Sequence, residues 1–189
     1  IIKERIKKRD NLIKAGYHPY PSKVKRGHLI GDVTRRFFFL SLLKRTVAVA
    51  GRITGMRIQG GVMFLDLKDA SGKIQAVLNK KGMKDFDLFK DNLDLGDFAG
   101  VSGTLFKTKK GEKSIKVKEL TVTTKSLRPL PSEWHGLKDV EERYRKRYLD
   151  LLVNEEVKDK LVMRSKIVQK LREILEKDGF LEVETPMLQ

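Results

Sequence analysis

Apolar residues alternate with polar ones from residue 46 onward, which is the period of half-buried β-strands. Turn-forming residues interrupt the alternation at Gly60-Gly61, at 69–72 and at Lys109-Lys110-Gly111. Within each segment the apolar residues share one side and predict a core face. The pattern predicts strands at about 46–53, 62–68, 73–78, 98–107 and 114–122, with Val47, Val49, Ile53, Met63, Leu65, Leu67, Ile74, Ala76 and Leu78 facing the core.

Two other segments have the helical period. Residues 2–15 place three isoleucines and a leucine at roughly helical spacing among lysines and arginines, and Gly16 can end this helix. A second helix is expected around Phe86, Phe89 and Leu93, between the third and fourth strands. Three strands, a helix and two strands are the order of an OB-fold. We therefore predict a mainly β fold with flanking helices, built on a five-stranded OB barrel.

The segment from 31 to 45 is rich in phenylalanine and leucine, with Phe37, Phe38 and Phe39 in succession. We expect a short helix that packs on the barrel. The alternative is an apolar contact surface for a partner.

A proline-rich connector divides the chain near Leu130, which lies between Pro129 and Pro131. The residue before a proline favours extended geometry, so neither a helix nor a sheet ladder continues through this point. Beyond the connector, Asp139 can cap a helix with Glu142 three positions later.

This helix is basic and aromatic, since Arg143 and Arg147 share one face and Tyr144 and Tyr148 share another. An apolar stripe then predicts a longer helix over about 155–177 that ends at Gly179, followed by a strand over 180–183. The predicted organisation is a helical extension over 1–45, a barrel over 46–125, a connector with the basic helix over 126–153, and the start of a second domain over 154–189.

A net charge of +16 on 189 residues exceeds what solubility requires, and it favours an anionic partner. Nucleic acid fits best, because the basic residues are spread over every segment and do not form one membrane-binding face. The absence of cysteine excludes disulfides and thiolate metal sites, and no apolar run is long enough to span a bilayer. His18, His28 and His135 lack metal-ligand spacing, so no metal site is expected, and a cytosolic protein fits this composition.

The outer face of the first three strands carries candidate binding residues. Phe64 shares its parity with polar residues, opposite the core-facing set, which favours a stacking platform. Gln75 points outward from the third strand and is expected to lie diagonal to Phe64, while Arg52 points outward from the first. An aromatic ring, an amide and a guanidinium on one face make a single-strand reader.

The connector resembles that of lysyl-tRNA synthetases in three sequence motifs, Leu-Arg-Pro-Leu-Pro, His-Gly-Leu and Arg-Tyr-Arg-x-Arg-Tyr-Leu-Asp-Leu. The long helix followed by Gly-Phe-Leu-Glu-Val-Glu-Thr-Pro-Met-Leu resembles motif 1 of class II synthetases, with Pro186 as its signature proline. The resemblance implies an anticodon-binding OB-fold, followed by the first helix and strand of a class II α+β catalytic domain. It also implies tRNA(Lys) as the partner and a homodimer built on motif 1, with Arg164, Ile167, Leu171 and Pro186 at that interface.

Within this family the phenylalanine, the glutamine and a first-strand arginine contact the anticodon, which assigns that role to Phe64, Gln75 and Arg52. A glutamate near the end of the last strand joins them, and Glu119 stands in that place, although a strand bend is needed to turn it outward. Weaker contacts to the tRNA backbone are expected from lysines and arginines of the last hairpin and the basic helix: Lys107, Lys109, Lys110, Arg143 and Arg147.

The family's motif 2 and motif 3 arginines have no counterpart here, so no catalytic residue is assigned. We expect a fragment that binds tRNA without aminoacylating it, while the full-length parent uses ATP and Mg²⁺ to attach lysine. The alternatives are an aspartyl- or asparaginyl-type synthetase and a non-catalytic OB-fold binder of single-stranded RNA.

Overall fold

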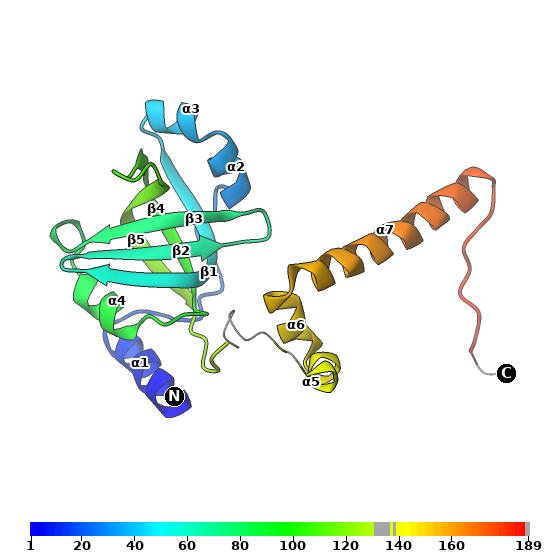
Figure 1. The fold of residues 1–189 in the computed structure, drawn as a ribbon, viewed down its shortest axis with the longest axis horizontal. Coiled ribbons are helices and arrows are strands. Elements are labelled where there is room, and N and C mark those ends of the chain that lie inside the picture. Colours follow the sequence, from blue (N-terminus) through cyan, green and yellow to red (C-terminus); the bar gives the residue numbers. More distant parts are fainter. Residues whose placement is uncertain (131–136, 138, 188–189) are drawn as a thin grey trace. The chain divides into compact units, whose positions relative to one another are not determined.

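The structure is a computed structural model that describes residues 1–130, 137 and 139–187. Most of the predicted proline connector, including Pro131 and His135, lies outside the described residues, as do Leu188 and Gln189. The chain separates into two compact units, Ile1–Pro129 and Leu130–Gln189, which Figure 1 shows with their elements labelled. Each unit is described by itself.

Five strands of the first unit form a closed barrel, as the alternation predicts. The strands are β1 (Thr46–Gln59), β2 (Val62–Lys68), β3 (Lys73–Asn79), β4 (Phe98–Lys107) and β5 (Lys113–Thr124). Their order around the barrel is β1-β2-β3-β5-β4, and β4 pairs back onto β1. β3 and β5 pair in parallel, whereas the other neighbours are antiparallel. This is the OB-fold topology.

The barrel interior is filled by the alternating apolar side chains. Gly103 lies where β4 approaches β5 so closely that a Cβ atom would come within 2.0 Å of the carbonyl oxygen of Lys116. Only glycine fits such a contact without a backbone shift. The predicted core set is confirmed, because all its members are buried: Val47, Val49, Ile53, Met63, Leu65, Leu67, Ile74, Ala76 and Leu78.

The N-terminal helix α1 (Ile2–Lys14) packs against α4 (Phe86–Asn92), which follows the short 3-10 turn η1 (Lys80–Gly82). Leu12 is fully buried at this contact, and the ring of Tyr17 meets that of Phe89 edge-on at 5.1 Å. The Asn11 side chain donates to that of Asn92 at 3.0 Å. Gly16 ends α1 in the left-handed conformation with φ of 86°, as expected.

The phenylalanine-rich segment forms two short helices, α2 (Ile30–Arg35) and α3 (Phe37–Leu42). Phe37 and Leu40 enter the core, so the predicted short helix on the barrel is confirmed. The other apolar side chains of α3 are exposed, with Phe38 at 80% and Phe39 at 60%. α3 therefore uses only part of its apolar surface for packing.

Asp69 attaches α2 to the turn between β2 and β3. Its carboxylate accepts the backbone N–H of Ile30 at 3.0 Å, and also those of Ser71 at 2.7 Å and Gly72 at 3.0 Å. Gly31 donates to the Ser71 hydroxyl at 2.8 Å, and a Cβ on Gly31 would lie 2.6 Å from the Ser71 carbonyl oxygen. The start of α2 and the turn are thus one hydrogen-bonded unit.

The second unit contains α5 (Val140–Arg145), α6 (Arg147–Val153) and α7 (Glu155–Lys177). Asp139 caps α5, because its carboxylate accepts the N–H of Glu141 at 3.0 Å. The prediction of one continuous helix carrying Arg143 through Tyr148 is wrong. Lys146, with φ of −116° and ψ of 49°, departs from helical geometry and separates α5 from α6.

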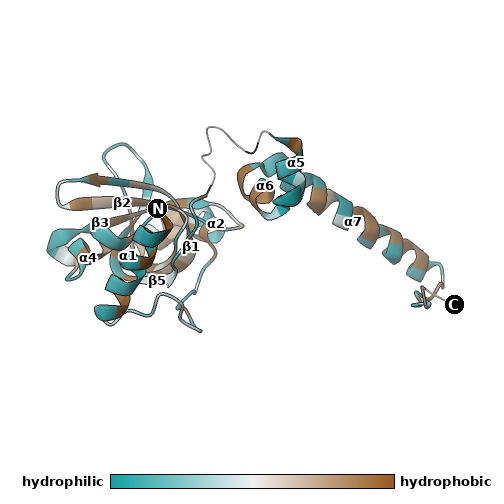
Figure 2. Ribbon diagram, turned by 90° about the horizontal axis from the view of Figure 1, so that it is seen from below, coloured by the Kyte–Doolittle hydropathy of each residue, from teal (hydrophilic) through white to brown (hydrophobic). Residues whose placement is uncertain are grey.

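The long helix α7 has the predicted bounds, and Gly179 follows it with φ of 89°. Hydrophobic and hydrophilic residues alternate along it in Figure 2. The strand predicted over residues 180–183 is not formed. A strand needs a neighbouring backbone to complete its hydrogen bonds, and within the described residues this segment has none, leaving Leu181 84% exposed.

Among the described residues, no helix combines the length and the apolar character that crossing a membrane requires.

Replacing Asp69 with Ala should lower the free energy of unfolding by about 2 kcal/mol, because it leaves three N–H groups, two of them partly buried, without their acceptor. Burial alone would raise the pKa of Asp69, but hydrogen bonds from Ser71, Ile30 and Gly72 outweigh it and lower the pKa. The stabilisation is therefore present at neutral pH and is lost as the pH falls through the lowered pKa. Urea unfolding at neutral and acidic pH measures both effects.

The matched control is Asp87→Ala, since Asp87 forms an exposed ion pair with Lys80 at 2.7 Å. Exposed pairs contribute little, about 0.5 kcal/mol. Equal losses for the two variants at neutral pH would contradict the role given to Asp69.

Candidate nucleic-acid interface

One row of side chains crosses the outer face of the barrel. Arg57 on β1 is opposite Phe64 on β2, which is opposite Val77 on β3, which in turn is opposite Lys116 on β5. Directly opposed residues of a sheet point to the same face. The row therefore places one cation, Arg57, directly beside a half-buried aromatic ring that points away from the core, and a second, Lys116, beyond Val77 in the same row. We call Arg57, Phe64, Val77 and Lys116 the outer row.

Asp66 lies next to the outer row and forms ion pairs with two nearby cations, Arg57 and Lys73. Its carboxylate is 3.5 Å from Arg57 Nη2 and 3.5 Å from Lys73 Nζ. Gly55 lies opposite Asp66, and a Cβ there would come within 2.5 Å of the carboxylate. The glycine thus leaves space for the acid, which holds the guanidinium of Arg57 near Phe64.

Gln75 lies diagonal to Phe64, as predicted, because it is opposite Asp66. Its side chain is only 7% exposed, however, and its oxygen accepts the Ser114 hydroxyl at 3.0 Å. Gln75 forms part of a cavity of about 530 Å³ beside the outer row. The side-chain amide of Gln75 is thus held in the wall of this cavity by Ser114, whereas the sequence suggested an amide that projects freely into solvent. The cavity is lined by Thr34, Asp66, Lys73, Ile74, Gln75, Lys110, Gly111, Glu112 and Lys113.

Glu119 is turned outward by the strand bend that the sequence required. The β4–β5 register shifts between Ser102 and Gly103, so that Val117 faces Gly103 while Glu119 faces Ser102. A bulge of this kind moves the following residues to the opposite face. Glu119 is exposed, and one carboxylate oxygen accepts the Ser102 hydroxyl at 3.3 Å.

Arg52 points outward, as predicted, but it does not lie beside Phe64. It is opposite Lys68 on β2, four residues or roughly 13 Å along the strand from Phe64. Its guanidinium lies 4.3 Å above the ring of Phe98 and donates to the carbonyl oxygen of Gly96 at 3.2 Å. Burial lowers the pKa of Arg52. These contacts give Arg52 a structural role.

The arginine beside Phe64 is Arg57, which the sequence reasoning missed. If side chains alternated strictly along β1 from an outward-pointing Arg52, the side chain of residue 57 would point inward. A register shift between Ile53 and Gly55 reverses that parity. The available signal was the Gly60-Gly61 turn, because counting back from a two-residue turn pairs residue 57 with 64.

The lysines expected on the tRNA backbone lie at the tip of the β4–β5 hairpin. Lys107, Lys109 and Lys110 are all exposed, and Lys110 also lines the cavity beside Gln75. The turn is closed by Gly111 N–H donating to the Thr108 carbonyl at 2.8 Å. Their position near the cavity is compatible with phosphate contacts.

The two arginines of the basic helices are held by a buried acid. Arg143 Nε lies 2.9 Å from Asp150 Oδ1, and Arg147 Nη1 lies 2.7 Å from Asp150 Oδ2. Asn154 donates to the same carboxylate at 2.6 Å. These bonds, that of Asn154 first and then those of the arginines, lower the pKa of Asp150. The break at Lys146 allows both guanidinium groups to reach one acid.

The residues assigned to motif 1 lie on α7 and on the segment that follows it. Ile167 and Leu171 are 55% and 56% exposed, and Arg164 is exposed as well. Pro186 lies in the non-helical segment. An apolar stripe exposed on a long helix is typical of a surface that another element covers.

No group of three or more acidic or histidine side chains that could hold a metal ion occurs in the described part of the chain.

Comparison with known proteins agrees with this geometry. Residues 47–123 match the OB-fold nucleic-acid-binding domain family, and residues 139–189 match the class II tRNA synthetases of the D, K and N group. The barrel is therefore an OB-fold nucleic-acid-binding domain, and the segment after the connector is of the kind found in class II tRNA synthetases.

The relatives give the particular family. A lysine–tRNA ligase of Carboxydothermus hydrogenoformans is 46% identical over 100% of this chain and 38% of its own length. Others from Roseiflexus sp. and Methanosarcina mazei are 48% and 44% identical, each over 98% of this chain, and the chain spans 39% and 37% of their lengths. The chain belongs to the lysine–tRNA ligase family and spans well under half the length of these curated relatives.

Replacing both Arg143 and Arg147 with Gln should reduce the helix content and the thermal stability of the second unit, because the buried Asp150 loses both cationic partners. Far-UV circular dichroism measures the change. Arg145→Gln is the control, since Arg145 forms only an exposed pair with Glu141. Unchanged helix content together with weaker tRNA binding would instead support the RNA-contact role expected from the sequence.

Proposed function

We propose that this chain binds tRNA and that the outer face of its barrel reads the anticodon. Phe64 stacks on a base, Arg57 contacts that base or its phosphate, and Gln75 and Glu119 hydrogen-bond base edges. The observation that carries the proposal is the outer row, where an aromatic ring outside the core lies opposite Arg57, shares its row with Lys116 and is bordered by a polar cavity. OB-folds bind single-stranded RNA through such faces.

In the whole protein, this recognition serves the attachment of lysine to tRNA(Lys) with ATP and Mg²⁺ in the cytoplasm. The names of the relatives support this activity. The exposed stripe of α7 supports a homodimer, whose interface would cover Ile167 and Leu171. Residues 1–189 alone bind tRNA without aminoacylating it.

A second function, general binding of single-stranded RNA, is favoured by the net charge of +16. It predicts no dependence on the anticodon. The two functions are separated by comparing an anticodon stem-loop that reads lysine codons with one whose central uridine is replaced. Anticodon reading requires weaker binding of the altered loop, whereas equal affinity would leave only the general function.

Replacing Phe64 with Ala should weaken binding of the lysine stem-loop by about 1 to 3 kcal/mol, the contribution of one stacked base. Fluorescence anisotropy at fixed salt measures the loss. Phe98→Ala is the control, because Phe98 stacks on Arg52, five residues along β1 from the Arg57 that lies opposite Phe64. An unchanged affinity for Phe64→Ala would remove this residue from the site.

Arg57→Gln and Arg52→Gln form a matched pair with the same change in charge on the same strand. Arg57→Gln should lower affinity for the lysine stem-loop about tenfold, since a charge-assisted hydrogen bond contributes about 1.5 kcal/mol. Arg52→Gln should instead lower stability by about 1 kcal/mol through the lost contact with Phe98. Titration and urea unfolding of both variants test the assignment, and the reverse pattern would restore Arg52 to the site.

A further inference from the structure

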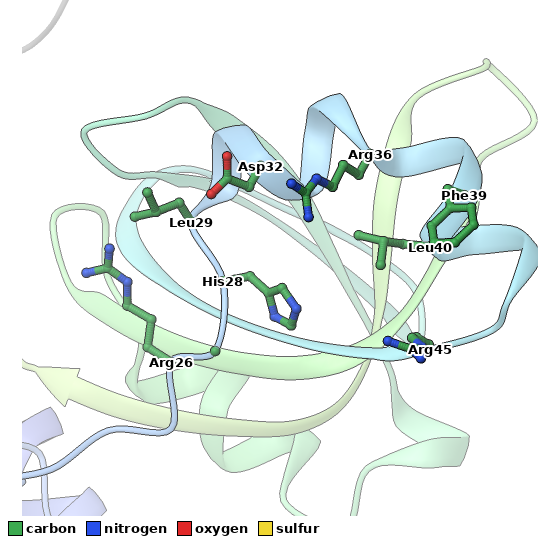
Figure 3. Close-up of a pocket in the computed structure, with 9 residues that line it drawn as sticks. Arg26, His28, Leu29, Asp32, Arg36, Phe39, Leu40 and Arg45 are labelled. Atoms are coloured by element: carbon green, nitrogen blue, oxygen red, sulfur yellow. The ribbon is translucent and has the colours of Figure 1, made fainter.

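A second cavity on the barrel unit concentrates cationic side chains away from the outer row. It has a volume of about 770 Å³ and lies between the segment before α2, the helices α2 and α3, and the start of β1. Figure 3 shows Arg26 and Arg45 on opposite sides of this cavity, with Arg36 above and His28 between them. No residue of β2 or β3 lines it. We call it the arginine cavity.

The arginines of this cavity differ from most others in the unit. Among the described contacts, Arg26, Arg36 and Arg45 have no side-chain hydrogen bond or ion pair, and all three are exposed. Of the other six arginines of residues 1–129, only Arg128 shares this state. The remaining five contact a carbonyl or carboxylate oxygen: Arg5, Arg9, Arg35, Arg52 and Arg57.

The one acid of the cavity does not neutralise these cations. The Asp32 carboxylate is already paired with Arg35, whose guanidinium lies 2.5 Å away. The cavity therefore keeps a strong positive charge. Guanidinium groups bind phosphate in bidentate geometry, so three of them around one hollow suit a phosphate-bearing ligand.

Two further groups fit a nucleotide. Phe39 lines the cavity and is 60% exposed, which gives a base or ribose an aromatic surface. The Nδ1 atom of His28 is buried, and it has no hydrogen-bond partner among the described residues. A buried polar atom without a partner is costly, and a turn of the imidazole ring would bring it within reach of a polar ligand in the cavity.

The arginine cavity is separated from the cavity beside Gln75 by the width of one helix. Asp32 and Arg36 line the arginine cavity, whereas Thr34 lines the other, because residues two apart on a helix face nearly opposite directions. A helix is roughly 10 Å wide, which about three stacked nucleotides span at 3.4 Å each. A strand leaving the outer row can therefore reach the arginine cavity.

From this geometry we propose that the arginine cavity is a second RNA-binding site, which holds backbone phosphates of the same tRNA beyond the anticodon. It rests on the proposed tRNA-binding function but adds a contact that does not read sequence. Phosphate contacts position RNA and strengthen binding, whereas base contacts specify it. The cavity thus raises the affinity for tRNA irrespective of the anticodon.

The test replaces Arg26, Arg36 and Arg45 with Gln in the full 189-residue chain and measures tRNA affinity by fluorescence anisotropy over a range of salt concentrations. We expect at least a tenfold loss at physiological salt. The slope of log affinity against log salt should become shallower by about 2, at about 0.7 per single-stranded phosphate. The ratio of affinities for the lysine anticodon and its altered form should stay unchanged, which separates this site from the outer row.

A matched variant replaces the exposed residues Lys3, Lys7 and Lys14 of α1 with Gln, which removes the same charge from another surface. It should change affinity less than threefold. If both triple variants bind tRNA equally well, the proposal is overturned. A different result would be that the wild type shows no preference for the lysine anticodon while the triple arginine variant still binds tRNA more weakly. That result would refute anticodon reading and would support the arginine cavity as an RNA-binding site.

A second pair of variants separates loss of the binding site from general misfolding of the chain. Phe39→Ala should weaken tRNA binding several-fold, whereas Phe38→Ala should not, because Phe38 is 80% exposed and does not line the cavity. Equal effects would contradict the site. ATP is the probe for a free nucleotide. If ATP binds wild type but not the arginine variant, and tRNA affinity is the same for both, the RNA assignment is wrong.

Discussion

The barrel unit depends on a buried ammonium group, that of Lys125, which directly follows β5. Its side chain has no exposed surface and lies between two carboxylates, with Nζ 2.7 Å from Asp97 Oδ2 and also bonded to Asp94. An unpaired charge at this depth is strongly destabilising. Burial alone would raise the pKa of Asp94, but bonds from Lys125 and Lys8 lower it. The cluster therefore requires the end of β5, the loop before β4 and α1 to be in place together.

The same cluster fixes where the chain leaves the barrel. Ser126 N–H donates to Asp97 at 2.8 Å, and Arg5 donates to the carbonyl oxygens of Ser126 and Leu95 at 2.8 and 3.2 Å. α1 is thus attached to both the loop before β4 and the first residue after Lys125. Arg5 and Lys8 of the basic N-terminal helix are occupied by these contacts, so their charges are not available to a nucleic acid.

Local patterns predicted the barrel, because alternation and turn residues act between near neighbours in sequence. The errors occur where a distant contact changes the local pattern. A bulge after Ile53 turns Arg57 to the outer face beside Phe64, and residues 180–183 lack the partner strand that their composition favours. The outward turn of Glu119 was predicted because two apolar neighbours of its own parity made a bend necessary.

Prediction from charge is limited in the same way, since a net charge of +16 does not identify which cationic side chains can contact a phosphate. Arg143 and Arg147 look available in the sequence, yet Asp150, three residues beyond the second, holds both. Arg36 follows directly after Arg35, but only Arg35 pairs with Asp32. Availability is decided by the acids that folding brings near each cation. The electrostatic surface that a polyanion meets is therefore a property of the fold, and unpaired arginines around a hollow indicate a binding site better than basic runs in the sequence do.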